Sequence, residues 1–448
     1  MHIIRVIFIL LEVLILFNLL IVVHELGHFL AARWRGLYIE KFGVWFGKPL
    51  WKKTINGVQY SLGSLPFGGF VALPQLAPMD IIEGKADIDR AKLPKISALD
   101  KIIVAIAGPL FSLLLALCFA AIVWAVGHPV SEADSTTVIG YVAPDSPAQK
   151  VGLQPGDKIL SVDGKPVRRF MGMNDSVSWD VVRSEGDKIA VKFQRDGAVQ
   201  MVWVEPYKAE TRGWRRKSVR QLLIYPAETP IIDKVEPNTP AALLEYISKH
   251  PNDALVLHVE RAGAKIDVPV KPTLLPTAGE MKPRIGIQWD TTGKVSIQHP
   301  NPIEQVYNSV TSTLKTIGAV ASPKSDVKLQ HLSGPVGIGR IYYLLFQSER
   351  GWQLALWFSV ILNVNLAILN MLPIPVLDGG HIVLALIESV RRKPVNMRVL
   401  EVVQTSCAAV IIGYMLYITF FDVQDLPFVR KKLDQLESQS SAKNSQTP

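Results

Sequence analysis

The chain has 448 residues, 49% of them hydrophobic, and a mean hydropathy of +0.23. This is too apolar for an ordinary soluble protein of this length and favours a chain that is partly membrane-embedded and partly globular. The net charge of +9 could indicate nucleic-acid binding, but membrane topology explains it better, because much of the excess flanks apolar stretches. Two cysteines exclude a disulfide framework as the organising principle.

Four apolar stretches, residues 6–23, 102–126, 352–372 and 402–421, are each long enough, at about 20 residues, to span a bilayer. The first is not expected to be a cleaved signal peptide, because no small-residue cleavage site follows it. Basic residues are concentrated between stretches one and two and between stretches three and four. The positive-inside rule therefore places both segments in the cytoplasm and the central region outside, although the basic residues 430–432 argue mildly against this orientation.

The motif His24-Glu25-Leu26-Gly27-His28 lies at the end of the first apolar stretch. Two histidines four residues apart share one helix face, about 6 Å apart along the axis, so both imidazoles can reach one Zn²⁺. Glu25 can take a proton from a water whose pKa zinc lowers to about 7. An HExxH motif often arises by chance, but ionisable residues in a membrane-spanning stretch are costly and mark functional sites. The motif therefore predicts a zinc hydrolase.

A second polar element, residues 370–380 with the sequence NMLPIPVLDGG, follows the third apolar stretch. Pro373 and Pro375 must end the helix, and irregular backbone at membrane depth is tolerated only where it is buried or lines a wet cavity. Asp378 is then the natural third ligand, which leaves the fourth tetrahedral position to water. The alternative is a Pro-Gly turn that leaves the membrane with Asp378 exposed. In the predicted topology, both polar elements lie near the cytoplasmic ends of their spans.

Residues 138–207 alternate as short strands and turns, and Asp163-Gly164 suits a two-residue hairpin. Residues 152–167, GLQPGDKILSVDGKPV, resemble a PDZ domain, a module that captures extended peptides at a sheet edge. A poorer copy spans residues 232–272, in which 255–263 parallels 189–197. It lacks the GLxxGDxI segment and has a helix-like segment, 243–248, instead.

Three further segments complete the organisation. Residues 38–73 predict a hairpin or small sheet near the zinc helix, whose edge could hold a substrate as an extended strand. The basic run 212–220 is interpreted as a solvated linker, with lipid headgroups or nucleic acid as the alternative contacts. The tail after residue 437 is predicted to be disordered.

The HELGH motif, the PDZ-like tandem and the NxxPxPxxDGG element together resemble the bacterial site-2 protease family, over residues 20–421. The resemblance implies a polytopic α-helical membrane protein with about four transmembrane helices, a membrane-reentrant β-hairpin and an inserted extracytoplasmic, β-rich PDZ-like tandem. It implies Zn²⁺ as cofactor, held by His24, His28 and Asp378, and Glu25 as the catalytic residue.

The resemblance also implies a substrate-binding role for Asn370 and for Gly68, Gly69 and Phe70 in the reentrant β-loop, and it matches residues 332–338 to the family's SGPxxI element. Two features depart from the family pattern. Ser112 stands where the family's AGPLxN element ends in asparagine, which leaves that polar role open. The shortened second PDZ copy leaves substrate gating by a paired PDZ module open.

The predicted domains follow from these elements. They are a first span with the zinc motif (1–37), a cytoplasmic-side loop with the reentrant sheet (38–101), a second span (102–127), PDZ-like domain 1 (130–210), a truncated PDZ-like domain 2 (221–298), a linker with an amphipathic helix and the SGP element (299–350), a third span with the third ligand (351–380), a cytoplasmic loop and fourth span (381–425), and a tail (426–448).

The function that these patterns favour is a zinc-dependent intramembrane endopeptidase in the bacterial inner membrane. The family resemblance implies single-pass membrane proteins as substrates, such as an anti-sigma factor or a remnant signal peptide, with the lipid bilayer and no nucleic acid as partner. One alternative is a membrane-tethered PDZ scaffold with a structural or vestigial zinc site, against which the open fourth ligand position argues. Another is a metal transporter, which would need ionisable groups repeated along the spans, where mainly Glu12 is found. His331 and His381 are interpreted as ordinary histidines.

Overall fold

The computed structural model describes residues 2–76, 93–94, 96–211, 214–228, 231–235, 255–261, 264–271, 273–277, 280–284, 287–290, 294–348, 350–393, 395–427 and 429–430. The predicted helix-like segment 243–248 and the predicted disordered tail after residue 437 lie outside the described residues.

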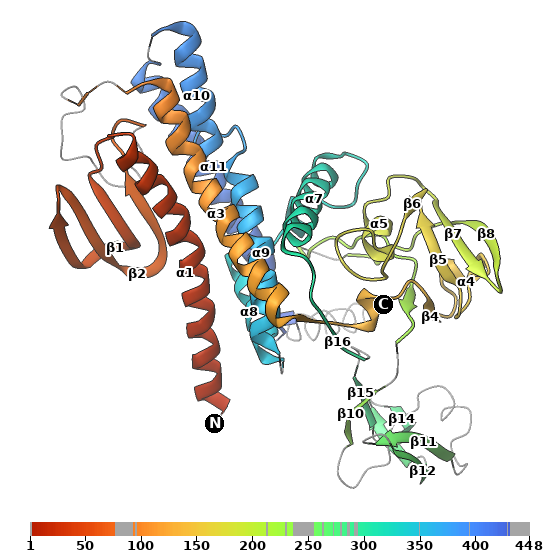
Figure 1. Cartoon of the computed structure of the whole chain (residues 1–448). Helices are drawn as coiled ribbons and strands as arrows, with labels where there is room; N and C mark the ends of the chain where they lie inside the picture. The colour runs from red at the N-terminus through yellow and green to blue at the C-terminus, as the bar shows by residue number, and fades with distance from the viewer. Residues whose placement is uncertain are drawn as a thin grey trace, which may run out of the picture.

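Four long apolar helices run side by side as a bundle: α1 (His2–Trp34), α3 (Ala98–Val126), α9 (Gly351–Asn370) and α11 (Met397–Gln424) (Figure 1). Each is long and apolar enough to cross a membrane, because a helix rises 1.5 Å per residue and the bilayer core is about 30 Å thick. The limits of α3 follow from local chemistry, since Ser97 and Asp100 form a capping box at its start and Gly127 follows its end with φ +73°. The four predicted spans are confirmed as helices.

Helix α3 lies at the centre of the bundle and packs against α1, α9 and α10 (Asp378–Arg391). Its contact with α1 is close at Gly27, where an added Cβ would lie 2.4 Å from the Ala107 carbonyl oxygen. Small residues let helix backbones approach in this way inside membranes. On the outside of the bundle, large side chains such as Phe8 and Ile15 on α1 are exposed, as lipid-facing residues would be.

Helix α10 occupies the start of the segment that was predicted as a cytoplasmic loop before the fourth span, and no helix was predicted there. The sequence predicts a helix end at Pro373 and Pro375 and no helix that begins at Asp378, with a Pro-Gly turn only as the alternative. Asp378 instead begins the helix, and the two glycines let it pack closely on the preceding turn: an added Cβ at Gly380 would lie 2.1 Å from the Ile374 carbonyl oxygen. The third predicted ligand is thereby held on a helix rather than on a free loop.

The predicted hairpin near the zinc helix is confirmed as β1 (Lys41–Ile55) and β2 (Val58–Ala72), which pair antiparallel. The pair lies against α1, away from the rest of the bundle (Figure 1). Residues 41–44 pair both with 59–62 and with 69–72. Among the described residues, the segment 69–72 has a strand partner on that side alone, so it forms an edge of this small sheet.

The chain between α3 and α9 forms a β-rich insertion that leaves and rejoins the bundle at one point, where β3 (His128–Val130) pairs with β16 (Ser296–Gln298). Two amphipathic helices then return toward the bundle, α7 (Pro302–Ala321) and α8 (Pro335–Gln347). Figure 1 shows the insertion attached at the end of the bundle opposite to α10.

The first part of the insertion is built around a four-stranded sheet in the order β6-β5-β7-β8. Its elements are β4 (Ile139–Val142), α4 (Pro147–Lys150), β5 (Lys158–Val162), β6 (Lys165–Pro166), α5 (Val177–Val182), β7 (Ile189–Arg195), β8 (Ala198–Val204) and β9 (Ile224–Pro226). The predicted two-residue hairpin is confirmed at Asp163 and Gly164, whose φ values of +49° and +75° are those that a type I′ turn requires.

The second part contains β10 (Ile231–Val235), β11 (Leu255–Arg261), β12 (Ala264–Val270), β13 (Thr273–Thr277), β14 (Glu280–Arg284) and β15 (Ile287–Asp290). The pair β11–β12 has the same strand lengths and antiparallel pairing as β7–β8. This agrees with the sequence parallel between residues 255–263 and 189–197.

In the basic run 212–220, which was predicted to be a solvated linker, Arg216 and Arg220 instead form ion pairs with distant residues. The Arg216 Nη2 atom lies 3.0 Å from Asp422 Oδ1 at the end of α11. Arg220 is 6% exposed, and its Nε lies 3.0 Å from Asp326 Oδ2 after α7. The first ion pair ties the insertion to the bundle, and the second ties the run to the segment between α7 and α8. The local composition of the run does not reveal either contact.

Candidate metal centre and active site

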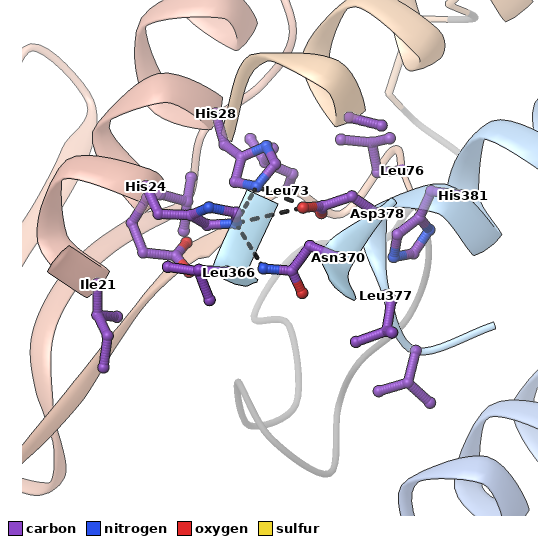
Figure 2. Close-up of a pocket in the computed structure, with 14 residues that line it drawn as sticks. Ile21, His24, His28, Leu73, Leu76, Leu366, Asn370, Leu377, Asp378 and His381 are labelled. Carbon is purple, nitrogen blue, oxygen red and sulfur yellow. Dashed lines mark hydrogen bonds and ion pairs between the residues drawn. The ribbon is translucent and has the colours of Figure 1, made fainter. Parts of the chain in front are cut away.

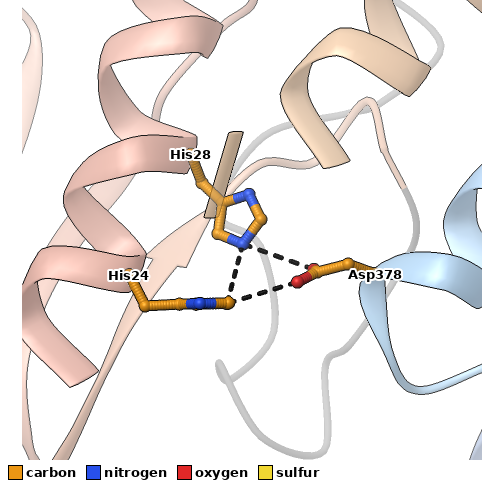
Figure 3. A group of neighbouring side chains, drawn as sticks. All are labelled: His24, His28 and Asp378. Atoms are coloured by element: carbon orange, nitrogen blue, oxygen red, sulfur yellow. Dashed lines mark hydrogen bonds and ion pairs between the residues drawn. The ribbon is translucent and has the colours of Figure 1, made fainter. Parts of the chain in front are cut away.

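The two motif histidines and Asp378 come together at the end of the bundle where α1, α3 and α10 meet (Figure 3). The Nε2 atoms of His24 and His28 are 3.3 Å apart. The two carboxylate oxygens of Asp378 lie 3.2 Å from His24 Nε2 and 3.3 Å from His28 Nε2. Both histidines are buried and Asp378 is nearly so, so the alternative of an exposed Asp378 in a surface turn is wrong.

The donor set fits a zinc ion. Ligand atoms placed about 2.0–2.1 Å from a tetrahedral Zn²⁺ lie about 3.3–3.4 Å from one another, which is close to the three observed separations. The buried Asp378 Oδ2 has no hydrogen-bond partner among the described residues, and a buried carboxylate oxygen needs a donor or a cation. Within the described residues, no second cluster of three His, Cys, Asp or Glu side chains with this spacing is found.

Helix α3 contacts both imidazole rings at their Nδ1 atoms, on the side away from Asp378. The Nδ1 atom of His28 lies 2.8 Å from the Val104 carbonyl oxygen, and the Nδ1 atom of His24 lies 2.9 Å from Ser112 Oγ. Between them, Gly108 supplies space, since an added Cβ would lie 2.2 Å from His28 Nε2 and 2.8 Å from His24 Nε2. Both Nε2 atoms are therefore free to face Asp378.

Glu25 lines the same cavity as His24, His28 and Asp378, a space of about 220 Å³ shown in Figure 2. The cavity walls are otherwise mostly apolar and include Leu73 and Leu366. A carboxylate in such a cavity, beside a metal-type donor set, is positioned to exchange a proton with a water there.

The predicted substrate-binding residues divide into two groups. Asn370 ends α9 and lines the cavity, with Nδ2 3.5 Å from His24 Nε2 (Figure 2). Gly69 lies beside Glu25, because an added Cβ would be 3.6 Å from Glu25 Cγ. Gly68 and Phe70 contact the Phe46 ring instead of lining the cavity.

Sequence reasoning missed several residues of the site. Val71 and His381 line the cavity, and Val104, Gly108 and Ser112 support the two histidines from α3. The available signal is the AGPLFS element at residues 107–112, from which the sequence analysis uses only the departure at Ser112. His331 has an ordinary role, as predicted, because its ring contacts the Lys328 amide and the Lys217 carbonyl.

The site combines three side chains that can bind a metal ion with the neighbouring carboxylate of Glu25. It lies among helices that can cross a membrane, and this combination is typical of the class of membrane-embedded metallopeptidases. The chain matches the family model of Peptidase family M50 over residues 12–414 and belongs to this family. It is an intramembrane zinc metalloendopeptidase.

Its relatives carry corresponding names. A Vibrio cholerae protein with the provisional name zinc metalloprotease is 28% identical, over 91% of this chain and 97% of the relative. The Escherichia coli regulator of sigma-E protease RseP is 26% identical, over 85% of this chain and 91% of the relative. The Arabidopsis thaliana chloroplastic membrane metalloprotease ARASP is 26% identical, over 94% and 80%.

Proposed function

We propose that His24, His28 and Asp378 hold the catalytic zinc ion and that Glu25 is the general base of peptide-bond hydrolysis. The observation that carries this assignment is the convergence of three metal-type donor atoms, 3.2–3.3 Å apart, in the cavity that Glu25 also lines. The scaffold alternative is disfavoured by the same geometry, because a structural zinc site is usually closed by four protein ligands.

The roles of the residues follow from their positions. When bound, zinc supplies Lewis-acid activation of water and of the scissile carbonyl group. Glu25 takes the proton from the attacking water and returns it to the leaving amine. The apolar walls lower the local dielectric constant, which strengthens the electrostatic interactions of Glu25 with the reacting groups.

The segment 69–72 is proposed to bind the substrate as an added strand, with Gly68, Gly69 and Phe70 shaping this edge. A peptide bond within a helix is sheltered by its own backbone, so a transmembrane substrate must become extended before attack. The open side of the segment and the closeness of Gly69 to Glu25 support this role. Asn370 is proposed to hydrogen-bond the substrate backbone at the cavity.

The β-rich insertion is proposed to be an extracytoplasmic PDZ-like pair, with domain 1 at 130–210 and the shortened domain 2 at 221–298, on a protein of the bacterial inner membrane. Its attachment at the end of the bundle opposite to α10 and the basic residues 391–393 at the end of α10 support this orientation. The β1–β2 pair is correspondingly proposed to be membrane-reentrant.

The substrates are proposed to be single-pass membrane proteins already trimmed outside the membrane, such as an anti-sigma factor or a remnant signal peptide. The name of the E. coli relative, regulator of sigma-E protease, supports the first of these. The insertion would exclude bulky, untrimmed substrates from the cavity.

Purified variants separate the two roles. The His24→Ala and Asp378→Ala variants are expected to lose bound zinc and cleavage together, whereas Glu25→Gln keeps its zinc and loses cleavage alone. Stoichiometric zinc with wild-type affinity in Asp378→Ala would remove Asp378 from the ligand set.

A further inference from the structure

Three residues of α3 form one stripe that faces the two histidines of α1. Val104, Gly108 and Ser112 are spaced four residues apart, so they lie on one face of the helix. His24 and His28 share a face of α1 in the same way. Because the two helices run antiparallel, Val104 meets His28 and Ser112 meets His24.

The two contacts fix which nitrogen of each imidazole is available. A neutral imidazole has one N–H and one free nitrogen, and the partner of one nitrogen decides the state of the other. The Val104 carbonyl can only accept, so His28 Nδ1 donates and its Nε2 is unprotonated. For Nε2 of His24 to be equally available, His24 Nδ1 must donate to Ser112 Oγ across the 2.9 Å contact.

The two histidines differ in how this hydrogen bond is supplied. His28 is held by a main-chain carbonyl group that no side-chain replacement removes. His24 is held by the hydroxyl group of Ser112, a side chain with 0% exposure and no other hydrogen-bond partner within the described part of the chain. A polar atom buried this deeply is costly unless it makes its hydrogen bond.

We propose that Ser112 is the positioning residue for His24: its hydroxyl oxygen accepts the His24 Nδ1 proton and holds the Nε2 atom toward Asp378. The inference rests on the proposed role of His24 as a zinc ligand. It assigns the polar role that the sequence left open where the family pattern has asparagine, because a serine oxygen can accept the same imidazole N–H as an amide oxygen.

The test is zinc affinity, measured by competition with a chromogenic chelator on the purified full-length chain in detergent. Ser112→Ala, which deletes one oxygen atom, is expected to weaken zinc binding by about 10–100-fold, the usual effect of losing a partner behind a metal-binding histidine. The absorption spectrum of the Co²⁺-loaded protein should change with it. The unfolding midpoint of the metal-free protein should stay at the wild-type value, because a role in positioning the ligand leaves packing intact.

Ser359 offers a matched control, since its hydroxyl group is also fully buried and lies 2.7 Å from the Tyr342 hydroxyl group, between α8 and α9. Ser359→Ala is expected to lower the metal-free unfolding midpoint and to leave zinc affinity unchanged. Ser112→Thr keeps a hydroxyl group and should recover the affinity lost in Ser112→Ala.

The outcomes separate this inference from the proposed function. If His24→Ala loses zinc but Ser112→Ala keeps wild-type affinity, the positioning role is wrong and the ligand assignment stands. If His24→Ala keeps its zinc, the ligand assignment itself fails. If Ser112→Ala loses metal-free stability in the manner of Ser359→Ala without a change in affinity, Ser112 serves packing and the proposal is overturned.

Discussion

Replacing Gly108 by alanine is expected to abolish zinc binding with little change elsewhere. The added Cβ would lie 2.2 Å from His28 Nε2 and 2.8 Å from His24 Nε2. Contacts between a methyl carbon and a nitrogen need more than 3 Å, so the His28 ring must move by about 1 Å, whereas a functional site tolerates ligand displacements of only about 0.2 Å. The substitution is therefore expected to remove at least one of the proposed ligands.

The loss of zinc affinity in Gly108→Ala has a lower bound. Loss of a partner behind a ligand already costs about 10–100-fold in metal affinity, and loss of a ligand must cost more. We expect zinc affinity to fall by more than about 100-fold, equivalent to about 2.7 kcal/mol or more, with peptide cleavage lost in parallel.

The assay is zinc content and chelator competition on the purified protein in detergent. Gly413 provides the control, because it lies within α11 and an added Cβ there meets nothing within 4 Å. Gly413→Ala should bind zinc as the wild type does. A Gly108→Ala variant with wild-type zinc affinity would show that the histidines do not converge beside this glycine.

Three further outcomes are expected. Asp422→Ala should lower the unfolding free energy in detergent by about 3–5 kcal/mol, because the buried carboxylate of Asp422 accepts two backbone N–H groups of the SGP element and pairs with Arg216; an unchanged unfolding midpoint would contradict this. Burial alone would raise the pKa of Asp326, but hydrogen bonds from Arg220 and Lys208 outweigh it and lower that pKa below its ordinary value of 3.8. The contribution of the ionised Asp326 carboxylate to folding stability is therefore present at pH values above that ordinary value and is lost as the pH falls through the lowered value. Arg220→Ala leaves the Lys208 contact in place and should therefore reduce that acid dependence, as followed by unfolding at each pH, and a wild-type profile would count against it. Asn370→Ala should raise the KM for a transmembrane substrate while zinc content stays constant, and a change in zinc content alone would argue against a substrate contact.

The parts of the site that are local in sequence were predictable. The HELGH spacing places both histidines on one helix face. The prolines before Asp378 predict that the third apolar helix ends there, and a carboxylate at membrane depth is costly unless it serves a site. Both conclusions needed only helix geometry and the apolar surroundings. The convergence of the two elements also followed, because the charge pattern put them near the same ends of their spans.

The supporting contacts were not predictable, because they join residues far apart in the chain. Ser112 and His24 are 88 residues apart, and Arg216 and Asp422 are 206 residues apart. Single-sequence patterns report periodicity within an element and carry no information on which faces of two elements meet. Helix α10 was missed for a different reason, since Gly-Gly is usually a turn signal and here serves close packing.

Cleavage of a single-pass transmembrane substrate in proteoliposomes tests the central claim most directly, with zinc-loaded wild type compared with zinc-loaded Glu25→Gln. The account predicts a wild-type product whose new termini, located by mass spectrometry, lie within the transmembrane segment, and no product from Glu25→Gln. Equal product from the two proteins would contradict the assignment of Glu25 as the base, and cleavage only outside the transmembrane segment would contradict the intramembrane site.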